Sequence, residues 1–341
     1  MVFPKLTSVL AIATIALMGS VSVATAEPFR LVVTDLEAPL VPNSVMDLAV
    51  NLGYFEREGV EVELVRVQQT PSAVAALQSG EGEMANIAVD TLLQLVSRGD
   101  ETLKAVVSPN KSLPYLIAAK QEITSPAELK GRSFGVGRVG SLDHSLSTLV
   151  LGTMAVDMNT LEVVTLGQPA TRAQALAAGQ IDSTTMSIGT WTSMPDKTGV
   201  HILVGQDDYY KAAPVVNKVN VVTTSVLENR HDEVESVIRA LVKISRDITV
   251  RPEVWVEGMA AARPDVSREN LQELVTTFAE SWSVNGGMSR QELQYTADWL
   301  YKTPDFQGLA PVGIEAWVDF SLVDAVLADL GTDGSLDQPT R

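Results

Sequence analysis

Short apolar runs alternate with amphipathic segments along most of the chain. The run FRLVVTD at 29–35 predicts a strand, and apolar residues at helical spacing within 44–59 predict a helix behind it. The alternation continues with strands expected at 60–67, 84–89 and 103–109 and helices expected at 71–80 and 90–99. Strands that alternate with helices in this way are typical of an α/β fold with largely parallel sheets.

The same rhythm starts again after residue 115 and then gives way to helices. Strands are expected at 115–120, 133–137, 161–167, 181–189 and 218–226, with helices at 141–156 and 169–179. From 228 onward the pattern is mainly helical, over 228–250, 267–282, 289–303 and 313–331. The terminal helices need a packing partner, and the first α/β block is the natural one.

These patterns divide the chain into two lobes that the backbone crosses twice, near 116 and 224. Lobe 1 is expected to comprise 27–115 plus 225–330, lobe 2 to comprise 116–224, and 331–341 to form a flexible polar tail. Two lobes and a double hinge describe a clamshell. Ligands of such sheets bind at the carboxyl ends of the strands, where helix N-termini point.

The first 26 residues have the pattern of a secretory signal peptide. Lys5 precedes an apolar run at 9–23, and Ala24-Thr25-Ala26 forms an A-x-A cleavage site. The apolar run is short for a membrane span, and no lipobox cysteine follows it. We therefore expect cleavage before Glu27 and a periplasmic protein.

Composition excludes several classes of function. A formal net charge of -17 makes binding to nucleic acid or to anionic membranes unfavourable. The absence of cysteine excludes disulfides and a thiol nucleophile. The three histidines, His144, His201 and His231, are far apart in sequence, which argues against a histidine-rich metal site. We expect no cofactor, no bound metal and a monomer.

A glycine motif, GVGRVG, lies between an expected strand and an expected helix. Gly135, Gly137 and Gly140 match G-x-G-x-x-G, the fingerprint of a dinucleotide site. The acid at the usual distance downstream, Glu162, begins a strand instead of ending one, and free nicotinamide cofactors are not expected outside the cytoplasm. The motif is better explained as an anion site formed by backbone amides at a helix N-terminus.

Four segments together resemble a known family. They are DLAVNLGYFEREGVEVELVRV, AVAALQSGEGEMANIAVDTLL, ITSPAELKGRSFGVGRVGSLDH and TRAQALAAGQID. Their order and spacing are similar to those of the solute-binding proteins of ABC importers, in the nitrate/sulfonate/taurine-type and thiamine-precursor-type group. The resemblance implies a type II periplasmic-binding fold, a ligand held between the lobes, and delivery to the membrane subunits of a permease. One departure is that family members often have Asp where this chain has Glu83 or Met84.

The candidate contacts lie where the expected strands end and the next helices begin. Arg138 is expected to fork onto a carboxylate or sulfonate, or else to pair with Asp143. Trp191 is the best aromatic platform, whereas Trp282 is more typical of a packed core. Asp90 is expected to cap its helix, and Arg172 is either a ligand contact or a surface charge. The expected ligand contacts are Arg138, Gly140, Ser141, Leu142, His144, Gln69, Thr70, Thr91, Asn110, Gln168, Arg172, Thr190 and Trp191.

Two classes of solute fit these residues. Two arginines facing one cleft favour a small organic anion, an aromatic carboxylate or a sulfonate. A neutral pyrimidine-like precursor is the alternative, with Asp143 and Glu37 accepting from ring amines. A secreted enzyme on the same fold and a sensor that docks onto a receptor are further alternatives. Ser141, Asp143 and His144 include the residue types of a catalytic triad, but neighbours within one helical turn cannot orient one another in those roles.

Overall fold

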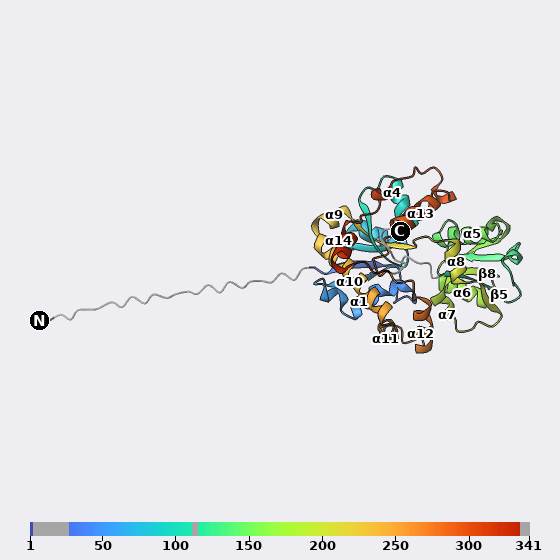
Figure 1. Ribbon diagram of the computed structural model, residues 1–341, viewed down its shortest axis with the longest axis horizontal. Helices are drawn as coiled ribbons and strands as arrows, with labels where there is room; N and C mark the ends of the chain where they lie inside the picture. Colours follow the sequence, from blue (N-terminus) through green and yellow to red (C-terminus); the bar gives the residue numbers. More distant parts are fainter. Residues whose placement is uncertain (3–26, 111–114, 335–341) are drawn as a thin grey trace.

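The chain forms two five-stranded sheets, each flanked by helices (Figure 1). A computed structural model describes residues 1–2, 27–110 and 115–334, without the side chain of Asn110. The first sheet has the order β2-β1-β3-β10-β4 and the second the order β7-β6-β8-β5-β9. The strands of the first sheet are β1 Phe29–Val33, β2 Val62–Arg66, β3 Met84–Ala88, β4 Leu103–Asn110 and β10 Lys218–Thr223. Those of the second are β5 Tyr115–Lys120, β6 Ser133–Val136, β7 Glu162–Thr165, β8 Ser183–Ser187 and β9 Val200–Val204.

The two sheets repeat one arrangement. β1 runs parallel to β2 and β3, and β10 lies antiparallel between β3 and β4. In the second sheet β6 runs parallel to β7 and β8, and β5 lies antiparallel between β8 and β9. The expected α/β architecture is therefore present twice, with one antiparallel strand inserted into each sheet.

Two sequence expectations need correction here. The strand expected at 218–226 within lobe 2 belongs instead to the first sheet as β10, and helix α9 already begins at Thr224. The chain thus returns to the first sheet before Lys218, earlier than the crossing expected near 224. The short edge strand β9 and the helix behind it, α8 Gln206–Ala212, were not expected from the sequence.

Helices cover both sheets, and the C-terminal ones pack on lobe 1 as expected. α10 contacts α1, α2 and α14, and α13 contacts α4. Lobe 1 carries η1 Pro42–Ser44, α1 Val45–Asn51, α2 Tyr54–Arg57, α3 Thr70–Ser79, α4 Val89–Ser97, α9 Thr224–Asn229, α10 His231–Val250, α11 Glu253–Ala262, α12 Arg268–Thr277, α13 Arg290–Leu300, η4 Pro304–Phe306, η5 Ile314–Ala316 and α14 Ser321–Leu330. Lobe 2 carries η2 Pro126–Leu129, α5 Leu142–Thr153, η3 Met158–Thr160, α6 Pro169–Ala177, α7 Ile188–Thr192 and α8.

Strand β5 shows how the second sheet is buried on both faces. Leu116 and Ala118 belong to a small apolar core on one face, whereas Ile117 and Ala119 join a larger core on the other. This follows from the alternation of side chains along a strand. The larger core also includes the central strands and C-terminal helices of lobe 1, so apolar packing runs from one lobe into the other.

The return connection between α8 and β10 is itself buried. Val215 and Val216 are each 1% exposed, and the Val216 amide donates to Thr296 Oγ1 of α13 at 2.9 Å. The first residues of the polar tail expected from 331 are hydrogen-bonded to lobe 1. Arg246 donates to the Gly331 carbonyl at 2.6 Å, and Asn285 bonds Asp333. Residues 335–341 of that expected tail lie outside the described residues.

No helix within the described part of the chain has the length and apolar character needed to cross a bilayer. Nearly all of the expected signal peptide, residues 3–26, falls outside the described residues.

Candidate functional site

The carboxyl ends of the parallel strands of both sheets meet at the junction of the lobes. Gln168, which precedes α6, donates to the Gln68 carbonyl beyond β2 at 3.2 Å. Tyr210 of α8 donates to Glu292 of α13 at 3.3 Å, and α7 packs against α12. In Figure 1, α7 and α12 accordingly lie side by side where the two lobes meet. The lobes are therefore in contact, and loops from both enclose the junction.

Lobe 1 contributes a lysine and an aspartate to this junction. Lys218 Nζ donates to Thr34 Oγ1 at 2.7 Å and lies 3.8 Å from Asp35 Oδ2. Thr34 and Asp35 follow β1, and Lys218 begins the antiparallel β10, so both strand ends lie at the same edge. The lysine side chain keeps 20% of its surface exposed and the aspartate 32%, so neither is fully committed to the other.

Lobe 2 contributes a second ion pair, which is more buried. Arg172 Nη1 lies 3.3 Å from Asp143 Oδ2, with the arginine side chain only 5% exposed. The same guanidinium donates to the carbonyls of Gly167 at 2.6 Å and Thr185 at 3.1 Å. Arg172 is therefore not a surface charge, and among the described residues its buried Nε has no hydrogen-bond partner. Asp143 pairs with Arg172, whereas the sequence offers Arg138 as one of its two alternative partners.

The glycine motif holds its own carboxylate. The Gly137 amide donates to Asp143 Oδ2 at 2.8 Å, so the chain supplies an anion where a dinucleotide phosphate would be held. Gly140 has a φ of +76°, which favours glycine, and its amide donates to His144 Nδ1 at 3.2 Å. These contacts explain the spacing of the motif without a nucleotide.

Ser141 occupies the N-cap position of α5 as expected, but its side chain does not cap the helix. The hydroxyl donates to the Arg138 carbonyl at 2.6 Å and also bonds the Asp143 carboxylate. It makes no hydrogen bond to His144 among those described, and His144 Nδ1 already accepts from Gly140. A nucleophile and base pair is therefore not assembled from these residues.

Tyr115 lies between the two ion pairs. Burial raises the pKa of its phenol to about 12, and the negative charge of Asp143 adds to that rise. A hydrogen bond with Asn217 and the charge of Arg172 oppose the rise, while Asp35 supports it. Charges from both lobes thus act on one tyrosine.

A second group of charges joins the lobes beside α4. Burial raises the pKa of Asp90 to about 6, opposed by a hydrogen bond from the Thr91 amide and by the charge of Arg138. Asp305 of η4 adds to the rise, and its carboxylate lies against Gly140 of lobe 2. Asp90 is the second residue of α4 and not its cap, since Ala88 holds the N-cap position. The exposed Arg138 loop thus faces acids of lobe 1.

Four helices begin at this junction without a side-chain cap. The residues before α3, α4, α5 and α6, namely Gln69, Ala88, Ser141 and Gln168, make no capping hydrogen bond. By contrast, Thr223, Ser267 and Ser289 cap α9, α12 and α13, and Ser187 caps the short α7. The first amides of an uncapped helix can bind an anionic or hydrogen-bond-accepting group. In α4, however, the Val89 amide donates to the Asn217 carbonyl at 3.2 Å and the Thr91 amide donates to Asp90, and Pro71 and Pro169 supply no amide hydrogen in α3 and α6. The start of α5 is therefore the best candidate for an anion site.

The remaining expected contacts have mixed surroundings. Thr70 Oγ1 accepts from the Ala88 amide at 3.3 Å, and Thr91 bonds Asp90. Thr190 bonds Ser187 at 2.9 Å. Gln69 is exposed and Leu142 is buried, while the side chain of Asn110 lies outside the described residues.

The two candidate tryptophans, Trp191 and Trp282, differ in burial. Trp191 packs, partly buried, against the smaller core, with Lys197 Nζ 5.7 Å from its ring centroid. Trp282 is buried against Trp255 and Phe278, which confirms its place in a core. Glu37, an expected ring-amine acceptor, pairs with Arg263.

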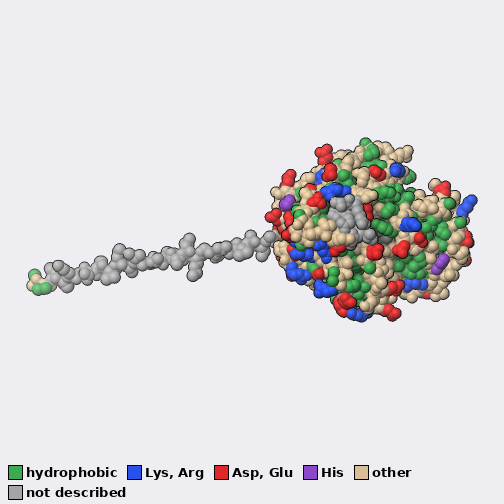
Figure 2. Space-filling model, viewed as in Figure 1, with side chains coloured by type: hydrophobic (Ala, Val, Ile, Leu, Met, Phe, Trp, Pro, Cys, Tyr) green, Lys and Arg blue, Asp and Glu red, His purple; other side chains and the backbone are tan. Residues whose placement is uncertain are grey.

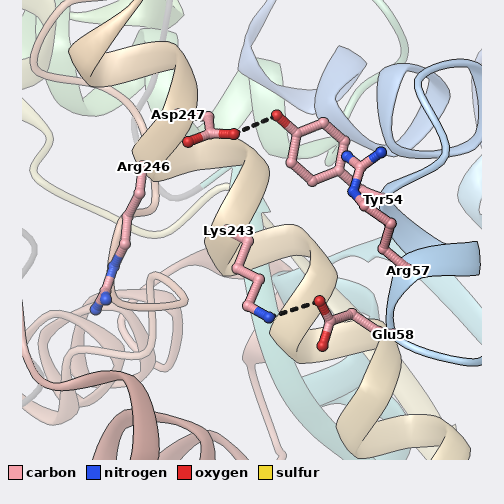
Figure 3. A pocket seen from close by; sticks show the side chains of 6 residues that line it. All are labelled: Tyr54, Arg57, Glu58, Lys243, Arg246 and Asp247. Carbon is pink, nitrogen blue, oxygen red and sulfur yellow. Dashed lines mark hydrogen bonds and ion pairs between the residues drawn. The ribbon is translucent and has the colours of Figure 1, made fainter.

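A surface hollow of about 550 Å³ lies elsewhere, between α2 and α10 (Figure 3). Its polar side chains pair with one another, since Tyr54 donates to Asp247 at 2.5 Å and Lys243 to Glu58 at 2.6 Å. Arg246 donates to several partners outside the hollow. Most of the charged groups that line the hollow are therefore already paired. Within the described residues, no three acidic or histidine side chains are arranged to hold a metal.

The surface charge agrees with an acidic protein. Acidic side chains are spread over both lobes on the face seen in Figure 2. Any anionic ligand must therefore be held by local donors, against the field of the whole chain.

Comparison with solved structures defines the fold class. A gene product of Candida albicans, described as having the generic periplasmic binding protein fold, matches with a TM-score of 0.62 at 15% identity, over 88% of this chain and 94% of its own. A putative periplasmic sulfonate-binding protein of an ABC transporter from Methylobacillus flagellatus KT matches with a TM-score of 0.67 at 13% identity, over 90% and 96%. The desulfurization enzyme DSZB matches with a TM-score of 0.60 at 16% identity, over 89% and 99%. The chain therefore has a periplasmic-binding-protein fold, which binding proteins and an enzyme share.

The family follows from the sequence match. Residues 45–253 match the family described as NMT1/THI5 like, and the chain belongs to that family. The expected family resemblance is confirmed. No curated protein sequence matches the chain.

Proposed function

We propose that this protein is the solute-binding component of an ABC importer. It captures a small organic anion, an aromatic carboxylate or a sulfonate, between its lobes in the periplasm and delivers it to the permease. The observation that carries this proposal is the junction itself, where α5 begins without a capping side chain beside the exposed Arg138, and where Lys218 of lobe 1 stays partly exposed. The sulfonate-binding neighbour supports the solute class, and the expected signal peptide supports the compartment.

The cations of this proposal differ from those expected from the sequence. Arg172 already has a carboxylate and two carbonyl partners, so Lys218 replaces it as the second cation. Arg138 forks onto the anionic group, the first amides of α5 add hydrogen bonds, and Lys218 approaches from lobe 1. Closure around the solute then forms the state that the permease recognises.

A neutral, pyrimidine-like solute is the second candidate, and the acids of the junction favour it. Asp35, Asp90 and Asp305 all belong to lobe 1, and Lys218 Nζ lies 3.8 Å from the Asp35 carboxylate. A ring amine would donate to Asp35, because Glu37 and Asp143 are already paired with arginines. A solute of this kind would gain little from Arg138.

Arginine and lysine substitutions separate the two candidates. The affinity for benzoate, benzenesulfonate and a 4-aminopyrimidine is measured by calorimetry for Arg138→Ala, Lys218→Met and the exposed control Arg132→Ala. For an anion, we expect each of the first two changes to cost about 2 kcal/mol, roughly a 30-fold rise in Kd. Unchanged affinity in both variants would exclude the anion-binding proposal.

Turnover separates a binding protein from an enzyme on the same fold. The protein is purified from its own periplasm, and native mass spectrometry identifies any solute it retains. A retained organic acid that is released unchanged supports the importer. Conversion of that solute by the purified protein would instead assign an enzyme, as DSZB illustrates for this fold.

A further inference from the structure

A close approach between the lobes involves a glycine in α7. A methyl group at Gly189 would lie 2.7 Å from Leu40 Cβ and 2.8 Å from the Leu40 carbonyl carbon, and closer still to the carbonyl oxygen. Real Cβ atoms essentially never approach backbone so closely. Gly189 belongs to lobe 2, and Leu40 to the loop after β1 in lobe 1.

Neither Gly189 nor Leu40 can move easily to make room for a methyl group. The atoms that a methyl group would meet are the Leu40 backbone and Cβ, not the end of a flexible side chain. Leu40 is 6% exposed and part of the larger core. On the other side, Gly189 is buried, and its neighbour Ile188 packs against both cores.

The backbone conformation of Gly189 does not itself require glycine. Its φ is not in the left-handed region, and it lies within the short helix α7. Alanine has a higher helix propensity than glycine, so lobe 2 alone would accept the substitution readily. The requirement for a hydrogen at this position therefore comes from lobe 1.

We infer that Gly189 is a positioning residue that sets how far the two lobes close. This inference rests on the proposed function. Closure of the two lobes stops where α7 meets the Leu40 carbonyl, next to the place where α7 packs on α12. A side chain at 189 holds the lobes apart, so the groups of both lobes no longer reach one solute together. Affinity then falls although no ligand-binding group has changed.

A matched control lies in the same lobe. Gly152 of α5 is also in a helical conformation and exposed, and a methyl group there would meet nothing within 4 Å. Gly152→Ala thus makes the same chemical change without touching lobe 1. Because the chain contains no cysteine, two introduced cysteines can be labelled without background.

Electron–electron double resonance tests the inference directly. Spin labels at Ala75→Cys of α3 and Gln174→Cys of α6, both exposed, report the separation of the lobes. The distance between the two labels is measured in the protein as purified, and again after unfolding in urea and refolding, which removes any solute carried through purification. In at least one of these two samples, we expect the doubly labelled protein without a glycine substitution to show a short label-to-label distance, and Gly152→Ala to show the same distance. Gly189→Ala should lack this short distance in both samples. Thermal melting of each variant verifies that Gly189→Ala is folded.

The affinity of a solute gives a second measurement. If the closed population falls to about a tenth, the apparent Kd for benzenesulfonate rises about tenfold in Gly189→Ala and is unchanged in Gly152→Ala. A short label-to-label distance that persists in Gly189→Ala would overturn the inference. The inference would also fail if the labelled protein without a glycine substitution never showed that short distance. Failure of the proposed function differs, because it leaves the label distances as expected while no solute is bound.

Discussion

Each lobe has an ion pair near the equivalent edge of its sheet, but the cations of the two pairs differ in burial and in the number of protein groups they bond. In lobe 2, Arg172 bonds two carbonyls as well as Asp143 and is almost fully buried. In lobe 1, Lys218 bonds one hydroxyl, stands 3.8 Å from Asp35, and stays partly exposed. The comparison teaches that an arginine near a cleft can be used mainly by the fold, and that the more exposed lysine is the better candidate for contact with a ligand.

Removing the buried arginine should have the largest effect. Arg172→Ala leaves Asp143 and two backbone carbonyls without their donor, and breaking a buried pair in this way costs about 3 to 5 kcal/mol. Urea unfolding measures the loss. Arg132→Ala, an exposed change in the same lobe, should leave stability within about 0.5 kcal/mol. Equal stability of the two variants would mean that Arg172 is as free as Lys218.

Buried acids of the two lobes should respond oppositely to pH. The folded-state pKa of Asp90 is raised to about 6, so between pH 4 and 6 the native state holds a proton that the unfolded state releases. Stability therefore falls as pH rises through that window. Asp90→Asn removes the penalty, and its advantage over the unsubstituted protein should grow from near zero at pH 4 to about 2 to 3 kcal/mol at pH 7.5.

Asp182 in lobe 2 provides the opposing control. Burial alone would raise its pKa, but hydrogen bonds from Lys120 and Ser133 outweigh burial and lower the pKa to about 2. Its contribution is present above pH 4 and is lost as pH falls toward 2. Asp182→Asn should therefore be less stable than the unsubstituted protein at neutral pH and should approach it in acid. Parallel pH profiles for the two variants would contradict the assigned environments.

The smallest expected effect concerns helix starts at the junction and away from it. Ser267 caps α12 through its hydroxyl, so Ser267→Ala should cost about 1 kcal/mol in urea unfolding. Gln168 precedes α6 without capping it, so Gln168→Ala should cost less than about 0.5 kcal/mol. A larger cost for Gln168 would show that its bond to Gln68 carries stability between the lobes.

The fold was predictable because its signals are local. Alternating apolar positions and helix periods mark β1 to β8 without reference to distant residues. β9 was missed because it is a short edge strand that contains His201 and exposed Ile202, so its pattern is weak. β10 was recognised as a strand, but its sheet depends on a pairing with β3 and β4 across more than a hundred residues.

The candidate site was predictable in its loops and not in its charges. Helix-start positions such as Gln69, Ser141 and Gln168 follow from the order of strands and helices. The partner of Arg172 could not be read, because Asp143 comes from another α/β unit and meets it only after folding. Lys218 was missed for the same reason, since it reaches the junction only through the insertion of β10 into the first sheet.

The position of β10 also fixes an order of events during synthesis. β4 can join β3 in the first sheet only through β10, which leaves the ribosome roughly 130 residues after β3. Lobe 1 thus stays incomplete until all of lobe 2 has been made, whereas lobe 2 is a continuous segment and can fold first. The N-terminal half of the chain therefore cannot become a finished domain while the rest is still being made.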